Sequence, residues 1–422
     1  MSQRVAVVGT GMAGLAAARA CGDAGLDVTL FESRDGLGMA AHSLEVEGGI
    51  VDVPLRVMGE GRWDRTLELA RRAGMTTFNA DVRVSCNWMD QRTWFRSGHM
   101  PLTGWPMFGS WRHFRVRGLR LGMGLFRLAR RTRQFRDENL ELRLDEFAWR
   151  HMPDRLFWRG LILPILSTIC TCDEQRLNDW PAGQLLDLLD NILHSGELVR
   201  LNGGTVRFAE ALAGDFPAFF GNPVRFIRPA ADGLEVRNAC GQGDVYDHVI
   251  VATQANQLDF LDDDAFGAER EVLAAIPYAN GELVVHRDER FMPRRRSDWT
   301  ALNFMMDRQL GDAMFTVWVN AVEPTLTDKS PVFQTWSPMF EPMERQIIER
   351  IPMQRAVVNE SNAEVLARLE QWHDEPDRRL FYCGSWAYPG VPLLETAVRS
   401  AEAVASRLTG RAACRSRVAA SG

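Results

Sequence analysis

The chain has 422 residues, of which 46% are hydrophobic and 25% are charged, and its formal net charge is −6. This composition is typical of a globular protein with core enough for roughly two or three domains. No run of about 18 uncharged apolar residues is present that would span a membrane. The N-terminus also lacks the basic stretch and cleavage site of a signal peptide, so we expect a cytoplasmic protein.

The numbers and positions of cysteine and lysine limit which disulfides, metal sites and lysine-dependent mechanisms are possible. The seven cysteines are scattered along the chain without a framework, so we expect reduced thiols rather than disulfides. Cys170 and Cys172 have no second pair at a metal-ligand spacing, and we expect no metal site. Lys329 is the only lysine, so any mechanism that needs an active-site lysine has a single candidate.

The N-terminal segment predicts a strand–helix–strand unit. Arg4–Val8 is a short β-branched strand, Met12–Ala24 is an alanine-rich helix, and Asp27–Glu32 is a second strand. The turn from residue 9 to 14 reads GTGMAG, which fits G-x-G-x-x-G. A turn of this kind between a strand and a helix, followed by an acid at the end of the next strand, is typical of a dinucleotide site.

Each part of this turn has its own physical role. Gly9 permits the tight turn, Gly11 lets the backbone approach a pyrophosphate, and Gly14 lets the helix pack closely on the sheet. The helix N-terminus offers N–H groups and the positive end of its dipole to the phosphates. Glu32 stands where a carboxylate accepts hydrogen bonds from the adenosine ribose hydroxyls.

The rest of the chain alternates helical and strand-like segments. Residues 62–194 are mostly helical in pattern. Further strands are predicted at Pro223–Ile227, Gly233–Arg237, Val245–Ala252, Glu282–His286, Met314–Val319 and Arg379–Cys383. A final helix is predicted at Leu394–Leu408. We predict an α/β fold with a Rossmann-like nucleotide-binding domain (1–61, 195–275 and 375–410) and a discontinuous α+β substrate domain (62–194 and 276–374). We expect 411–422 to form a disordered tail.

One segment is strongly basic although the whole chain is acidic. No acidic residue occurs between Gln91 and Arg136, and this stretch carries eleven arginines. Apolar residues alternate with the arginines over 112–136. This segment is either a peripheral membrane contact, with its arginines on lipid phosphates, or a solvated helix face over the core. A single basic segment indicates a local anionic partner and no nucleic acid.

Several segments beyond the glycine turn share a pattern with a known superfamily. They follow in a fixed order at Ser33–Ala41, Val51–Val53, Gly203–Leu212, Val224, Val249–Thr253, Tyr382–Trp386 and Val391–Ser400. Together they resemble the FAD-dependent, amine-oxidase-like flavoprotein superfamily. Met39 and Ala40 depart from it, since they replace the second glycine and the arginine of its Gly-Gly-Arg element. The resemblance implies a glutathione-reductase-type domain that holds FAD noncovalently, with the last helix N-terminus at the flavin.

The resemblance also assigns the residues of the cofactor site. They are Gly9, Gly11, Met12, Ala13, Gly14, Glu32, Ser33, Arg34, Gly38, Met39, Ala40, Leu55, Arg56, Val57, Val224, Ala252, Thr253, Gly384, Ser385, Leu394 and Glu395.

Four catalytic candidates follow from the same resemblance. His286 ends the strand on which amine oxidases carry a lysine, and it is either a general acid–base or a structural histidine. Trp386 and Tyr388 form either an aromatic wall over the flavin or a packed pair at a turn. Arg56 pairs with the reduced flavin or a substrate carboxylate, or forms a plain salt bridge.

The substrate is suggested by one further segment. Ala275–Trp299 resembles a branch of FAD-binding oxidoreductases associated with cyclopropane fatty acid synthases, and some relatives of that branch act on fatty-acyl chains. We therefore favour an acyl-lipid desaturase or saturase that moves a hydride between a C–H bond and flavin N5. One alternative is an oxidase or dehydrogenase of a small amine or amino-acid-like metabolite. The other is a non-catalytic, escort-like binding protein of the same fold. A homodimer is compatible with the sequence.

Overall fold

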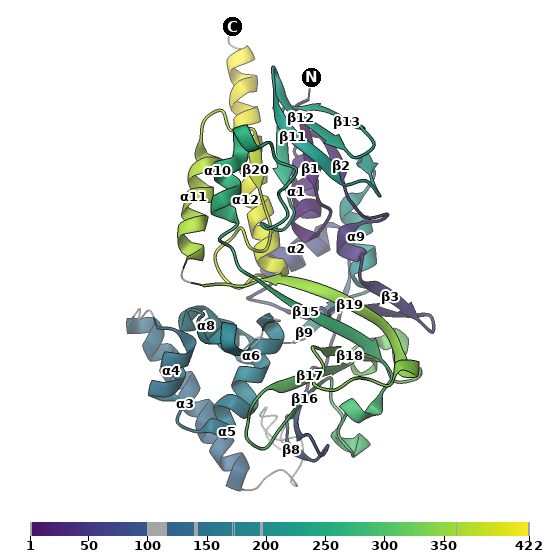
Figure 1. The fold of residues 1–422 in the computed structure, drawn as a ribbon, viewed down its shortest axis with the longest axis vertical. Helices are drawn as coiled ribbons and strands as arrows, with labels where there is room; N and C mark the ends of the chain where they lie inside the picture. Colours follow the sequence, from purple (N-terminus) through teal and green to yellow (C-terminus); the bar gives the residue numbers. More distant parts are fainter. Residues whose placement is uncertain are drawn as a thin grey trace.

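The computed structural model describes residues 2–98, 116–138, 142–170, 172, 174–194, 197–359 and 361–420. The chain forms two lobes, and both termini lie at the far end of one of them (Figure 1). We call the lobe with the termini the nucleotide lobe and the other the substrate lobe. In the described part of the chain, no helix is long and apolar enough to cross a membrane.

The nucleotide lobe is built on a five-stranded parallel sheet with the order β10-β2-β1-β14-β20. These strands are β1 (Arg4–Val8), β2 (Asp27–Phe31), β10 (Ala218–Phe219), β14 (His248–Val251) and β20 (Leu380–Tyr382). Because both faces of the sheet are covered, the central strands are continuous apolar runs rather than alternating ones. Val5, Ala6 and Val7 are all fully buried.

Helices and a β-ribbon cover the two faces of this sheet. One face packs against α1 (Met12–Asp23), α2 (Asp64–Arg72), α9 (Gly204–Ala213) and α12 (Leu394–Ala420). The other face packs against α10 (Asp263–Leu273), α11 (Asn362–Asp374) and the ribbon of β11 (Val224–Ala230), β12 (Gly233–Asn238) and β13 (Gly243–Tyr246). The predicted strand–helix–strand unit is confirmed as β1, α1 and β2.

The substrate lobe combines a seven-stranded sheet with a group of helices. The sheet has the order β19-β15-β18-β17-β16-β7-β8. Its strands are β7 (Val84–Trp88), β8 (Thr93–Arg96), β15 (Tyr278–His286), β16 (Leu302–Met306), β17 (Ala313–Trp318), β18 (Phe333–Trp336) and β19 (Ile347–Ala356). The helices are α3 (Val116–Glu138), α4 (Leu144–His151), α5 (Arg155–Phe157), α6 (Leu163–Cys170), α7 (Glu174–Asn178) and α8 (Ala182–His194). One hydrophobic core joins these helices to the sheet.

Two small sheets and several short turns complete the fold. The small sheets pair β3 (Ser43–Val46) with β4 (Gly49–Asp52), and β9 (Leu198–Leu201) with β5 (Met58–Gly59) and β6 (Thr77–Asn79). The short helical turns are η1 (Gly38–Ala40), η3 (Trp158–Ile162), η4 (Glu289–Phe291), η5 (Arg296–Asp298), η6 (Val319–Ala321), η7 (Pro324–Leu326) and η8 (Glu344–Gln346).

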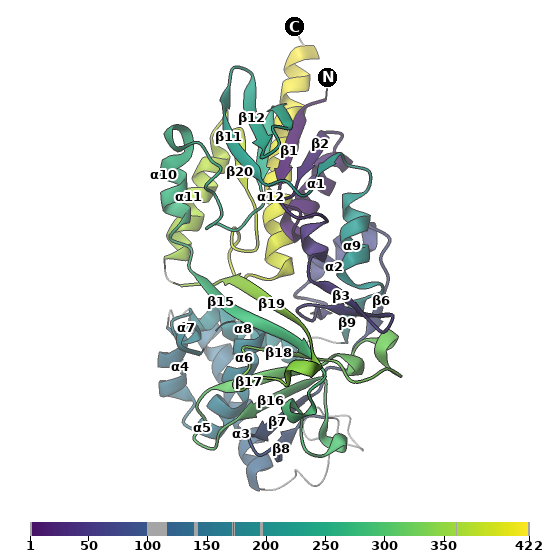
Figure 2. The same cartoon turned by 45° about the vertical axis from the view of Figure 1, so that its right-hand side comes forward.

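The strands β15 and β19 form a long ladder that begins at the junction of the lobes (Figure 2). Tyr278 starts β15, and its hydroxyl accepts a hydrogen bond from the Ala255 backbone N–H at 2.7 Å. His286 is the ninth and last residue of β15, so it lies at the end of the strand away from the nucleotide lobe.

Three predictions about elements need correction. Residues 77–96 hold the strands β6, β7 and β8 inside a segment predicted to be helical. The strand predicted at Val245–Ala252 is broken at Asp247, because β13 joins the ribbon and β14 joins the parallel sheet. The helix α12 continues to Ala420 instead of giving way to a disordered tail at 411, since the alanines and arginines there favour helix.

Candidate cofactor and active site

The glycine turn sits where the carboxyl ends of parallel strands meet, which is the usual place for a ligand in such sheets. Gly9 has a φ of +98°, a left-handed conformation that favours glycine. A Cβ added at Gly14 would lie 1.9 Å from the Gly9 carbonyl oxygen, so that position requires glycine for the helix to approach the strand. At Gly11 an added Cβ would meet nothing within 4 Å. Gly11 therefore faces open space at the start of α1, beside Met12 and Ala13, as a pyrophosphate site requires.

Glu32 ties this turn to the chain that follows β2. Its Oε2 accepts hydrogen bonds from the Thr10 backbone N–H at 2.9 Å and the Thr10 hydroxyl at 2.6 Å. Its Oε1 accepts from the Ser33 hydroxyl at 3.2 Å and the Arg34 N–H at 3.0 Å. The exposed Ser33 gives the longest of the four bonds, so it is the donor that a ribose hydroxyl would replace.

Thr10 is a functional residue that the sequence interpretation missed. It is fully buried, and its hydroxyl accepts a hydrogen bond from the Gly38 N–H at 2.7 Å while its carbonyl accepts from the Met39 N–H at 2.9 Å. It thus joins the glycine turn to η1. The only sequence signal was a hydroxyl residue at the second position of the turn.

The turn η1 replaces the Gly-Gly-Arg element of the superfamily. A Cβ at Gly38 would lie 2.7 Å from Glu32 Oε2, so this glycine is needed. Met39 and Ala40 pack their side chains against the core around α1. A hollow of about 410 Å³ next to them is lined by Arg34, Asp35, Gly36, Leu37, Ala40 and Ala41. Arg34 is exposed beside this hollow and provides a cation where the superfamily arginine is lost.

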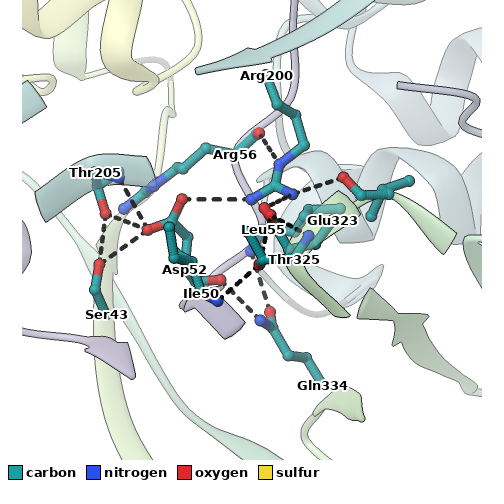
Figure 3. A network of polar contacts seen from close by, with 11 residues as sticks. Ser43, Ile50, Asp52, Leu55, Arg56, Arg200, Thr205, Glu323, Thr325 and Gln334 are labelled. Carbon is teal, nitrogen blue, oxygen red and sulfur yellow. Dashed lines mark hydrogen bonds and ion pairs between the residues drawn. The ribbon is translucent and has the colours of Figure 1, made fainter. Parts of the chain in front are cut away.

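A buried polar network fixes the segment after β4 (Figure 3). Arg200 is 1% exposed and donates to Glu323 Oε2 at 2.6 Å and to the Arg56 carbonyl at 3.1 Å. Asp52 lies 3.4 Å from Arg200, and its other oxygen accepts from the Thr205 hydroxyl at 2.6 Å. The network links β4, β9 and the start of α9 to the loop before η7.

Gln334 of the substrate lobe forms hydrogen bonds with the backbone of the same segment. Its side-chain amide donates to the Asp52 carbonyl at 2.7 Å and accepts from the Leu55 N–H at 3.1 Å. The backbone polar groups of Leu55 and Arg56 are therefore used by the protein itself. The side chains of Leu55, Arg56 and Val57 are half-buried. Sequence reasoning missed Arg200, Glu323 and Gln334, because their partners are distant in the chain.

Three arginines converge at the junction of the lobes. Burial and the nearby Arg355 guanidinium lower the pKa of Arg56 to about 10, although Asp52 acts in the opposite direction. Burial also lowers the pKa of Arg355 and that of Arg62. Cys170 interacts with both Arg355 and Arg62, which places α6 beside them. Asp187 and Glu395 act on Arg62 in the opposite direction, so the uncompensated positive charge lies at Arg56 and Arg355.

The turn after β20 is held against the end of β14. The Gly384 N–H donates to the Ser400 hydroxyl at 3.0 Å, which anchors the turn, including Ser385, to α12. The Trp386 indole N–H donates to the Thr253 carbonyl at 3.0 Å. Trp386 is only 4% exposed and belongs to the core of the parallel sheet. This packing matches the alternative given for Trp386, a packed aromatic residue at a turn.

Other predicted cofactor residues lie around the same strand ends. The Ala252 N–H donates to the Val8 carbonyl at 2.8 Å, which places it beside the glycine turn. Val224 starts β11, shortly after Gly221, whose N–H donates to the Arg34 carbonyl at 2.7 Å. These contacts bring both residues to the nucleotide edge of the sheet.

Glu395, predicted at the cofactor site, has partners within the protein. Its carboxylate is 5% exposed and accepts from the Thr66 N–H and hydroxyl, both at 3.0 Å, and from the Arg65 N–H at 3.2 Å. These groups form the first turn of α2, where a negative charge is stabilising. Leu394 begins α12 next to it. Tyr388 is half-buried and forms a hydrogen bond with Arg399, so it remains at the junction.

His286, predicted as either a general acid–base or a structural histidine, lies inside the substrate lobe at the far end of β15. The side chain is fully buried, and its Nδ1 accepts from the Asp288 N–H at 3.1 Å. Nε2 therefore carries the proton and donates to the Thr335 hydroxyl at 2.8 Å. Burial lowers the pKa of His286 to about 4, and the rings of Phe291 and Phe333 lie against it. His286 is a neutral structural residue.

Comparison with protein families decides the class of the chain. A family model described as flavin containing amine oxidoreductase matches residues 12–295. The chain belongs to this family. As a flavin-containing amine oxidoreductase, it is an FAD-dependent oxidoreductase rather than an escort-like binding protein, and its glycine turn, Glu32 and strand ends fit that cofactor.

Solved structures share this fold at low sequence identity. A protein from Exiguobacterium sp. 255-15, provisionally named a protoporphyrinogen oxidase, aligns with a TM-score of 0.70 and 14% identity, over 97% of this chain and 99% of its own. A fatty acid isomerase from P. acnes that produces CLA aligns with a TM-score of 0.67 and 16% identity, over 95% of this chain and 98% of its own. A putrescine oxidase aligns with a TM-score of 0.65 and 14% identity, over 97% of this chain and 99% of its own. No curated protein sequence matches this flavoprotein significantly.

Proposed function

We propose that this flavoprotein desaturates or saturates an acyl lipid. The observation that carries the proposal is the positive charge at the lobe junction. Arg56 and Arg355 lie partly buried there, and a cationic amine would be repelled by both of them. FAD supplies the redox chemistry, since it takes a hydride from a substrate C–H bond or returns one while a proton leaves or joins the adjacent carbon.

The position of the only lysine agrees with this proposal. Lys329 is exposed in the loop after η7, and it acts electrostatically on Glu47 at the tip of the β3–β4 hairpin. Lys329 is not among the groups that act on Arg56, Arg62 or Arg355. The lysine-dependent arrangement of amine oxidases therefore has no counterpart in this chain.

A continuous apolar core reaches the junction from the helices of the substrate lobe. Val391, just before α12, belongs to the same hydrophobic cluster as Leu121 and Leu128 of α3. Leu393 and Ile169 pack against that cluster from the edge. An acyl chain entering along these helices would meet apolar side chains up to the strand ends that hold the cofactor.

Anaerobic reduction of the bound flavin tests the proposal. Loss of the flavin absorbance on adding a saturated acyl lipid, or reoxidation of reduced enzyme by an unsaturated one, is the expected result. Putrescine and longer alkylamines serve as the comparison at equal concentration. Rapid bleaching by amines, with none by acyl lipids, would contradict the proposal and make the amine oxidase alternative correct.

A further inference from the structure

We propose that Arg56 and Arg355 together bind the carboxylate of the substrate, which makes a free fatty acid, rather than an ester or an amide, the substrate class of this site. The inference rests on the proposed function and adds the chemical form of the substrate. It also assigns a role to Arg355, a residue of β19 that the sequence interpretation did not single out.

The two arginines that are buried most deeply in the described part of the chain, Arg200 and Arg378, have carboxylate partners. Arg200 lies 2.6 Å from Glu323, and Arg378 lies 2.5 Å from Glu269. Arg56 and Arg355 differ, because neither guanidinium forms a hydrogen bond or ion pair with any residue in the described part of the chain. Each guanidinium is only partly hydrated and is repelled by the other, so an anion that binds both would stabilise the pair.

The nearby groups do not supply the missing charge. Asp52 is the one acid that acts on Arg56, and its carboxylate is already bound to Arg200 and Thr205. Cys170 lies close to Arg355, but burial raises its pKa well above the ordinary value, so the thiol stays neutral. The two guanidinium groups therefore repel each other with no anion between them.

The two side chains are also placed to receive a ligand. Both are half-buried, and none of their nitrogen atoms is sealed from solvent. Arg56 is positioned by the contact of its carbonyl with Arg200, and Arg355 is positioned by the β15–β19 ladder, where it pairs with Ala279. A carboxylate has two oxygens and matches two guanidinium groups that approach from different elements.

A ligand titration on the FAD-loaded enzyme tests the inference. Dodecanoate, methyl dodecanoate and dodecylamine are added separately, and binding is followed by the shift in the visible flavin spectrum. Wild-type enzyme is expected to bind dodecanoate about tenfold to a hundredfold more tightly than the ester, and dodecylamine most weakly. Arg355→Gln is expected to remove this preference while leaving ester affinity unchanged, and Arg355→Lys to keep part of it.

Arg350→Gln is the matched control on the same strand. Arg350 forms ion pairs with Glu282 and Glu341 at the surface, so its loss should leave the preference for dodecanoate intact. Equal affinity for acid and ester in the wild type would overturn the carboxylate site, even if acyl esters bleach the flavin. Release of FAD from Arg355→Gln, measured from the 450 nm region after gel filtration, would also overturn it, since the arginine would then bind the cofactor. An arginine-dependent preference for dodecanoate supports the site, whether or not acyl lipids reduce the flavin.

Discussion

At the scale of single residues, Gly11 and Gly14 separate two requirements of the cofactor turn. Gly14→Ala would force a methyl group against the Gly9 carbonyl, 1.9 Å from the added carbon. We expect this overpacking to lower the free energy of unfolding of the apoprotein by about 1–3 kcal/mol. Gly11→Ala meets no protein atom within 4 Å, so the apoprotein should stay within about 1 kcal/mol of wild type.

The same pair should behave differently toward FAD. Gly11→Ala places its methyl group where the pyrophosphate approaches, so we expect FAD affinity to fall by about tenfold or more in a well-folded protein. Denaturant unfolding of the apoproteins and fluorescence titration with FAD measure the two effects. Unchanged FAD affinity in Gly11→Ala would mean that the phosphates lie elsewhere.

His286 gives a prediction about pH. The folded protein lowers its pKa to about 4, whereas the unfolded chain has a value of about 6.5. The unfolded state therefore binds the extra proton first, so the contribution is complete above about pH 6.5 and is lost as pH falls toward 4. The loss amounts to about 3 kcal/mol. His286→Gln should be less stable at neutral pH but show a shallower decline over this range, and parallel curves from chemical denaturation would disprove the assignment.

At the scale of elements, two carboxylates of α12 bind α2: Glu395 accepts from backbone and hydroxyl groups of its first turn, and Glu402 pairs with Arg65. Glu395→Gln keeps the size of the side chain but removes the charge at the first turn of α2, so we expect a loss of about 1–3 kcal/mol in unfolding free energy. Glu402→Gln on the same helix breaks only an ion pair with Arg65 and should cost less than about 1 kcal/mol. If Glu395→Gln instead weakens FAD binding without destabilising the apoprotein, then the carboxylate contacts the cofactor.

Elements were predictable from the sequence where their pattern is local. β1, α1 and β2 follow from apolar runs and a glycine turn within one short segment. β7 was missed because its buried Ser85 and Asn87 interrupt the apolar pattern of a strand. Ser85 donates a hydrogen bond to the Asn303 side chain of β16, and Asn87 donates one to the Phe304 carbonyl of the same strand. That partner is more than two hundred residues away, so no local pattern reveals it.

The candidate site shows the same division. The glycine turn and Glu32 were found because their spacing carries the chemistry. The β15 strand was also found, but its far end was taken for the active site, since the sequence does not show which end meets the nucleotide lobe. The Arg200 network and Arg355 depend on the docking of separate segments, which only the fold provides.

At the scale of the whole molecule, the outer face of α3 bears on the two interpretations of the basic segment. Of residues 112–136, those before Val116 lie outside the described part. Leu121 and Leu128 of α3 are buried against the core, whereas Met123 is 48% and Phe126 is 70% exposed. Arg127 and Arg130 follow on the same helical face and are also exposed.

An apolar pair beside arginines is the arrangement that inserts into an anionic membrane surface, so we propose that α3 brings the enzyme to its lipid. Wild-type protein should sediment with vesicles that contain anionic lipid, and less so as salt is raised. Replacing Arg127 and Arg130 with glutamine should weaken partitioning by about fivefold for each charge, while Met123→Ser with Phe126→Ser should weaken it at every salt concentration. Arg71→Gln, on the exposed side of α2, is the control because Arg71 is paired with Glu68 in the other lobe. Vesicle binding that is absent in the wild type, or equal in all four proteins, would make α3 a solvated face and leave a fatty acid to reach Arg56 and Arg355 from solution.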